Sequence, residues 1–90
     1  MSRSPFPRRN ALWYTYLVRC RDGTIYTGVT NNLEKRLAVH NAGKGAAYTR
    51  SRRPVTLVFF QRHRTRSKSL KEEARFKRLS RDQKEALLLN

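Results

Sequence analysis

The chain has 90 residues, with 21 Lys or Arg against 6 Asp or Glu, so its net charge at pH 7 is +15. This length suits one domain with a small core, the lone cysteine excludes an internal disulfide and a cysteine-rich zinc site, and no apolar run approaches the ~20 residues of a membrane helix. We therefore expect a polyanionic partner, DNA rather than RNA, and no membrane.

The first ten residues are basic and include two prolines around Phe6, so we expect residues 1–10 to form a flexible basic arm. The segment lacks the apolar core of a secretory signal, and we expect cytoplasmic residence. Residues 11–90 would then form the single domain. Its first part reads as a hairpin, with strands over 12–20 and 24–29 around the Arg21-Asp22-Gly23 turn.

A helix over 32–41 follows, with Asn31 or Asn32 as its N-cap and Gly43 just beyond its end. Its inward face, by the i, i+3, i+4, i+7 rule, carries two leucines together with Arg36 and His40. Burying these two polar groups is costly unless an anion meets them. With one tyrosine from each hairpin strand, Tyr16 and Tyr26, they predict a phosphate site.

Residues 43–53 show no helical or strand period and carry four positive charges. Basic loops of this composition lie on phosphate backbones, and an aromatic ring in them can stack on a base. Alternatively, this is a solvated loop that its tyrosine pins to the body. The candidate nucleic-acid-binding residues are Lys44, Tyr48, Arg50, Arg52 and Arg53.

The third strand is predicted over 55–61, buried on both faces, with His63 on the surface beyond it. A second long helix is predicted over 67–79, capped by Ser67 or Ser69. The element order is therefore β-β-α-β-α-α, an α+β fold.

The inward face of this second long helix is predicted to hold Leu70, Glu73, Ala74 and Lys77, which follow the same spacing rule. A final short helix over 81–89 would be capped by Ser80.

The chemistry must come from few groups, because Glu73 is the only acid at an inward position of a long helix. One carboxylate with waters and substrate phosphates is a normal way to hold Mg²⁺. Arg36 can stabilise the extra charge of a phosphodiester under attack, while a tyrosine or His40 handles the proton. We expect the surrounding positive charges to lower the tyrosine pKa.

At this point the residues resemble a known family, the GIY-YIG endonucleases, and within it the small stand-alone YhbQ-like (UPF0213-type) group. Thr15-Tyr16-Leu17 and Tyr26-Thr27-Gly28 resemble the two half-motifs, and Arg36 follows ten residues after Tyr26. His40 falls one turn later, where many members carry a histidine. The resemblance continues through the runs GKG (43–45) and YTR (48–50) to Glu73 in LKEEARFKRLSR, and spans residues 12–82.

The resemblance implies a three-stranded antiparallel sheet flanked by helices, and metal-dependent cleavage of DNA using Mg²⁺ or Mn²⁺. By analogy, Tyr16 and Tyr26 would act on the attacking water and its proton. Arg36 would stabilise the charge of the transition state, and Glu73 would bind the metal. His40 would be a proton carrier or phosphate contact. Such an enzyme would act in DNA repair or recombination.

Two departures from the family pattern bear on activity. Val29 stands where several members carry a lysine, so Lys44 or Arg50 would have to substitute, or activity is weak. The first half-motif also lacks its glycine. With no recognition domain in view, target choice would come from DNA shape, the basic surface or a protein partner. The alternative is a non-catalytic nucleic-acid-binding module on the same scaffold, for RNA or ribosomes.

Overall fold

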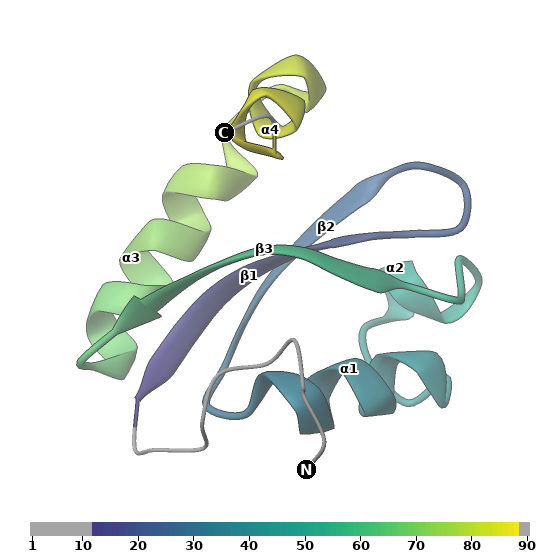
Figure 1. The fold of residues 1–90 in the computed structure, drawn as a ribbon, viewed down its shortest axis with the longest axis horizontal. Helices are drawn as coiled ribbons and strands as arrows, with labels where there is room; N and C mark the ends of the chain where they lie inside the picture. The colour runs from purple at the N-terminus through teal and green to yellow at the C-terminus, as the bar shows by residue number, and fades with distance from the viewer. Residues whose placement is uncertain (1–11, 89–90) are drawn as a thin grey trace, which may run out of the picture.

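The computed structural model describes residues 12–88, and the predicted arm over 1–10 lies outside this range. Figure 1 shows a small sheet with a helix on either side. The elements, in chain order, are β1 (Trp13–Arg19), β2 (Ile25–Thr30), α1 (Leu33–Asn41), α2 (Ala47–Arg50), β3 (Thr56–His63), α3 (Arg66–Lys77) and α4 (Arg81–Leu88). No helix in the described range is long and apolar enough to cross a membrane.

The sheet is antiparallel, with strand order β2-β1-β3, so the predicted fold class is confirmed. β1 is the central strand, in agreement with its apolar residues on both faces. Tyr16 pairs with Gly28 on one side and with Phe60 on the other. β3 lies at an edge and is only partly buried, so the prediction that it is buried on both faces was wrong. An edge strand has neighbours on one side only.

Alternation along β1 sends its side chains to two different cores. Tyr14, Tyr16 and Val18 pack with Leu33 of α1. Thr15 and Leu17, also fully buried, point to the opposite face, where the hydroxyl of Thr15 donates to a backbone carbonyl of α3. α1 and α3 therefore cover opposite faces of the sheet, as Figure 1 shows.

Local signals mark most element boundaries as predicted. The side chain of Asn32 caps α1 by accepting from the backbone N–H of Lys35 at 3.1 Å. Gly43 follows α1 with a positive φ of 81°, the conformation that glycine adopts most easily. Ser80 caps α4 reciprocally with Gln83, because each side chain bonds the other's backbone N–H.

Helix α3 differs from the prediction in its cap and in its buried face. Thr65, not Ser67 or Ser69, caps the helix, accepting from the N–H of Lys68. The residues fully buried on α3 are Ser69 and Phe76, seven apart, while Leu70 is 38% exposed. Ala74 and Lys77 are exposed as well. The inward stripe is therefore rotated by about one residue.

His63 is not the free surface histidine that its position predicts. Its Nε2 lies 3.1 Å from the hydroxyl of Thr15, which itself donates to the carbonyl of Ser69 at 2.8 Å. Since that hydroxyl has one proton, Nε2–H of His63 must be the donor. The side chain thus joins the end of β3 to β1 and α3.

Candidate active site

The inner part of the site is a hydrogen bond between a strand tyrosine and a helix histidine. Tyr16 projects from β1 and His40 from the last turn of α1; they are 2% and 0% exposed. The phenol oxygen of Tyr16 lies 2.8 Å from Nε2 of His40. Two residues 24 positions apart, both predicted as site residues, are therefore directly bonded in the core.

Thr49 of α2 fixes the direction of this bond. Its hydroxyl donates to the carbonyl of Ala46 at 3.0 Å and lies 2.8 Å from Nδ1 of His40. Having used its proton, Thr49 must accept from Nδ1–H, so Nε2 is bare and accepts the proton of Tyr16. Burial, with a further contribution from the charge of Arg36, holds the pKa of His40 below its usual value. The imidazole is therefore neutral, and its bare Nε2 accepts the hydrogen bond of Tyr16.

Glycines make room for the bonded pair. Gly28 stands opposite Tyr16 in the register, and a Cβ there would overlap the Tyr16 ring. A Cβ on Gly45 would likewise overlap the ring of His40. The second half-motif thus needs glycine because the tyrosine of the neighbouring strand lies across it.

Three other predicted groups influence Tyr16 electrostatically. Burial raises the pKa of Tyr16 to about 12; Arg36 opposes this rise, while Tyr26 and Glu73 add to it. The expectation that nearby positive charges lower the tyrosine pKa is therefore wrong for Tyr16, because desolvation outweighs Arg36. The same influences show that Arg36, Tyr26 and Glu73 all lie within electrostatic reach of one phenol.

Arg36 and Glu73 differ in their interaction partners. Arg36 is half-buried beside Tyr16, and its Nε has no hydrogen-bond partner among the described residues. The Glu73 side chain is 21% exposed and pairs with Lys77 at 3.5 Å, the helical ion pair that its spacing allows. No group of three His, Cys, Asp or Glu in residues 12–88 could hold a metal by itself.

An aromatic stack continues outward from the histidine. The Tyr26 ring meets His40 edge-on at 5.5 Å between centroids, and Tyr48 stacks on Tyr26 at 5.9 Å. The guanidinium of Arg52 covers Tyr48 at 4.0 Å and also pairs with Asp22 at 3.0 Å. Tyr48 pins its segment to the body, as one of the two alternatives proposed.

The rest of the predicted basic loop consists of a short helix and exposed side chains. Residues 47–50 form the helix α2, which the sequence pattern did not predict, since four residues are too few to show a period. Lys44, Arg50 and Arg53 are exposed. Val29 pairs with Thr15 and faces α3, away from Tyr16.

Thr49 is the site residue that the sequence did not single out. It is fully buried within a basic loop, where hydroxyl side chains are common and carry no distinguishing pattern. The available signal was its place in the YTR run, nine residues after His40.

Comparison with known proteins agrees with this geometry. Residues 12–86 match the model of the GIY-YIG catalytic domain. A UPF0213 protein of Halobacterium salinarum is 50% identical over 82% of this chain and 96% of its own length. A UPF0213 protein of Staphylococcus haemolyticus is 49% identical over 79% and 87%.

Two solved structures share the fold. The solution structure of a protein from E. faecalis has a TM-score of 0.62 at 45% identity, covering 89% of this chain and 85% of that one. The UPF0213 protein of Bacillus halodurans gives 0.55 at 39% identity, covering 86% and 82%. The family model spans most of the domain, and these relatives are well above 30% identity. The chain therefore belongs to the GIY-YIG family, within its UPF0213 group.

Proposed function

We propose that this domain is a metal-dependent endonuclease that hydrolyses phosphodiester bonds in DNA. The observation that carries the proposal is the chain of hydrogen bonds from Tyr16 through His40 to Thr49, beside the guanidinium of Arg36. A GIY-YIG domain supports nuclease chemistry, and a net charge of +15 supports a polyanionic substrate.

The proton path follows from the bond directions. A phenol with a pKa of about 12 is ionised in only about one molecule in 10⁵ at pH 7, so Tyr16 alone is a poor base. Neutral His40 provides an acceptor for the proton of the Tyr16 phenol. As water attacks phosphorus, the Tyr16 oxygen takes the water proton and passes its own to Nε2 of His40.

The atoms balance in this step. One O–H bond of water breaks and a new P–O bond forms, while the bond from phosphorus to the leaving oxygen breaks. The proton ends on Nε2 of His40, and the leaving oxygen takes one from solvent. Nδ1–H remains bonded to Thr49, which keeps the imidazole oriented as it becomes charged.

Arg36 would stabilise the charge that develops on the phosphoryl oxygens. A fixed guanidinium in a partly dehydrated site acts more strongly than one in water, because the local dielectric constant is lower. Its Nε is buried without a hydrogen-bond partner among residues 12–88, and none of the ion pairs in that range uses Arg36.

Glu73 fits a magnesium or manganese ion and not a zinc ion. A single carboxylate suits Mg²⁺, which keeps several waters and also binds substrate phosphates, whereas zinc needs three or four protein ligands. When bound, the ion would supply positive charge at the phosphate and the leaving oxygen. The carboxylate must leave Lys77 in part, which the 3.5 Å separation and the exposed side chain of Lys77 allow.

The biological setting that fits this chemistry is processing of DNA strands in repair or recombination. A domain this small reads the backbone and the shape of DNA, so a protein partner would supply target choice.

The test is nicking of supercoiled plasmid with Mg²⁺ or Mn²⁺ by the wild type, by Glu73→Ala and by Glu72→Ala. Glu72 is the matched control, because it is the adjacent carboxylate but pairs with Arg75. We expect the wild type and Glu72→Ala to nick at similar rates and Glu73→Ala to lose activity. Binding without nicking under either metal would favour the alternative, a non-catalytic nucleic-acid-binding module.

A further inference from the structure

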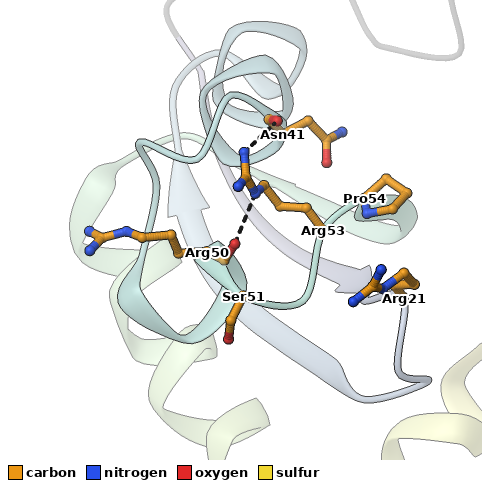
Figure 2. A pocket seen from close by; sticks show the side chains of 6 residues that line it. All are labelled: Arg21, Asn41, Arg50, Ser51, Arg53 and Pro54. Atoms are coloured by element: carbon orange, nitrogen blue, oxygen red, sulfur yellow. Dashed lines mark hydrogen bonds between the residues drawn. The ribbon is translucent and has the colours of Figure 1, made fainter.

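A second basic site lies beside the active site but uses other residues. It is a hollow of about 470 Å³ between the β1–β2 turn, the end of α1 and the segment that follows α2 (Figure 2). Its lining residues are Arg21, Asn41, Arg50, Ser51, Arg53 and Pro54. Three of the six are arginines and none is an acid.

Hydrogen bonds to the backbone hold the side chains at the floor of the hollow. The Nε–H of Arg53 donates to the carbonyl of Arg50 at 2.8 Å, and its guanidinium also approaches the carbonyl of Asn41. Figure 2 shows this side chain extended between the two carbonyls. The Asn41 amide is bonded twice to the backbone of Val55, at 2.7 and 3.1 Å. A Cβ on residue 43 would overlap the Arg53 guanidinium, so Gly43 leaves room for that group.

The charge of this hollow is uncompensated within the described part of the chain. The ion pairs in residues 12–88 use Arg19, Arg52, Arg75, Lys77 and Arg81. None uses Arg21, Arg50 or Arg53. Helix capping explains Arg53, which sits at the end of α1, but it does not explain the other two. Three like charges around one hollow attract an anion, which would offset their mutual repulsion.

We infer that this hollow binds a phosphate group of the nucleic acid other than the one that is cleaved. Forked guanidinium donors match phosphate oxygens in pairs, and the Ser51 hydroxyl adds another donor. The site adjoins the proton path, since Asn41 follows His40 and Arg50 follows Thr49. A phosphate here would position the strand relative to Tyr16. The inference rests on the proposed function only for the identity of the polyanion.

The first experiment locates the anion. Inorganic phosphate is titrated into protein labelled with ¹⁵N-arginine, and the side-chain Nε–H signals are followed. We expect saturable shifts at Arg21, Arg50 and Arg53, while the exposed Arg64 and Arg78 stay unchanged. Arg50→Gln should weaken binding several-fold. Parallel, non-saturating shifts at all arginines would overturn the site.

The second experiment measures its contribution to DNA binding in EDTA, where no cleavage occurs. Affinity for a short DNA duplex is measured against salt for the wild type, for Arg21→Gln/Arg50→Gln and for the charge-matched control Arg64→Gln/Arg78→Gln. The side chains of Arg21 and Arg50 make no hydrogen bond with the described residues, so the fold should persist. We expect the slope of log K against log salt to fall by about 0.9, one phosphate, and by less than ~0.3 in the control.

The outcomes separate this site from the proposed function. Equal slope changes in both double variants would overturn it, and a fall of about 1.8 would mean two separate phosphate contacts instead of one shared hollow. If the slope result holds but plasmid is never nicked, the phosphate site stands without the nuclease. If plasmid is nicked but the slopes match, the nuclease stands without the site.

Discussion

Two histidine–threonine networks, one buried and one partly buried, lie on opposite faces of the same sheet. On the α1 face, His40 bonds through both ring nitrogens to Tyr16 and Thr49. On the α3 face, His63 bonds through one nitrogen to Thr15, whose proton goes to a helix carbonyl. Both networks join three elements, so either one could be purely structural.

The difference lies in what each histidine faces. Nε2–H of His63 donates to a hydroxyl whose own proton is given to a carbonyl, so Nε2 cannot accept a proton from Thr15. Nε2 of His40 accepts from a phenol that lies next to Arg36 and within reach of Glu73. The comparison teaches that bond direction, rather than residue type, separates a proton acceptor from a structural link.

The largest expected effect compares His40→Gln with His63→Gln. Loss of a positioned general base costs about 10²–10⁴ in rate, so plasmid nicking by His40→Gln should fall by that factor. His63→Gln should nick within about threefold of the wild type but lose roughly 0.5–1.5 kcal/mol of unfolding free energy, the value of one hydrogen bond. Equal loss of nicking in both variants would remove the distinction between the networks.

An alkaline unfolding experiment isolates the phenol. The pKa of Tyr16 is about 12 in the folded protein against 10.0 for the free side chain, so the unfolded state loses its proton first. Stability therefore falls between pH 10 and 12, by up to roughly 2–3 kcal/mol for this group. Urea unfolding of wild type and Tyr16→Phe should show the smaller alkaline loss in the variant. Identical losses would mean that Tyr16 is not held neutral by burial.

Thr49 tests the orientation of His40. Thr49→Val leaves Nδ1–H without an acceptor, which should cost about 1–3 kcal/mol and mix the two imidazole tautomers. Thr49→Ser keeps the hydroxyl and should retain the Nδ1–H form. The ¹⁵N shifts of the His40 ring report the tautomer directly, whether or not the protein cleaves DNA. An unchanged tautomer in Thr49→Val would show that another group orients the ring.

The smallest effect concerns Lys77, which pairs with Glu73. Lys77→Gln should change the unfolding free energy by no more than about 0.5 kcal/mol, as for other helical ion pairs at this spacing. It frees the carboxylate, so the Mg²⁺ concentration for half-maximal nicking should fall about two- to threefold, a small electrostatic gain. Lys71→Gln on the same helix is the control. A matching change in that control would point to net charge alone.

The sequence predicted those parts that depend on local or periodic signals. The hairpin turn, the Asn32 cap, the Gly43 end and the inward face with His40 all follow from spacing and cap chemistry, and the structure confirms them. Gly28 of the second half-motif leaves room for the ring of Tyr16.

Other features depend on contacts between distant segments and left no local signal. The acceptor of the Tyr16 proton and the role of Thr49 depend on how α2 packs on α1. The rise of the Tyr16 pKa depends on burial, which outweighs the charge of Arg36 that the sequence displays. The α3 face was misjudged because Leu70 was taken as inward, whereas the small Ser69 occupies the close contact with β1.

The most direct test of the proton path compares Tyr16→Phe with Tyr26→Phe in plasmid nicking at saturating Mg²⁺. The hydroxyl of Tyr16 is bonded to His40. The hydroxyl of Tyr26 makes no hydrogen bond with the described residues, and its ring packs between His40 and Tyr48. We predict that Tyr16→Phe nicks about 10²–10⁴-fold more slowly and that Tyr26→Phe stays within about tenfold of the wild type. Wild-type rates in Tyr16→Phe, with activity lost in Tyr26→Phe, would contradict the transfer of the water proton through Tyr16 to His40.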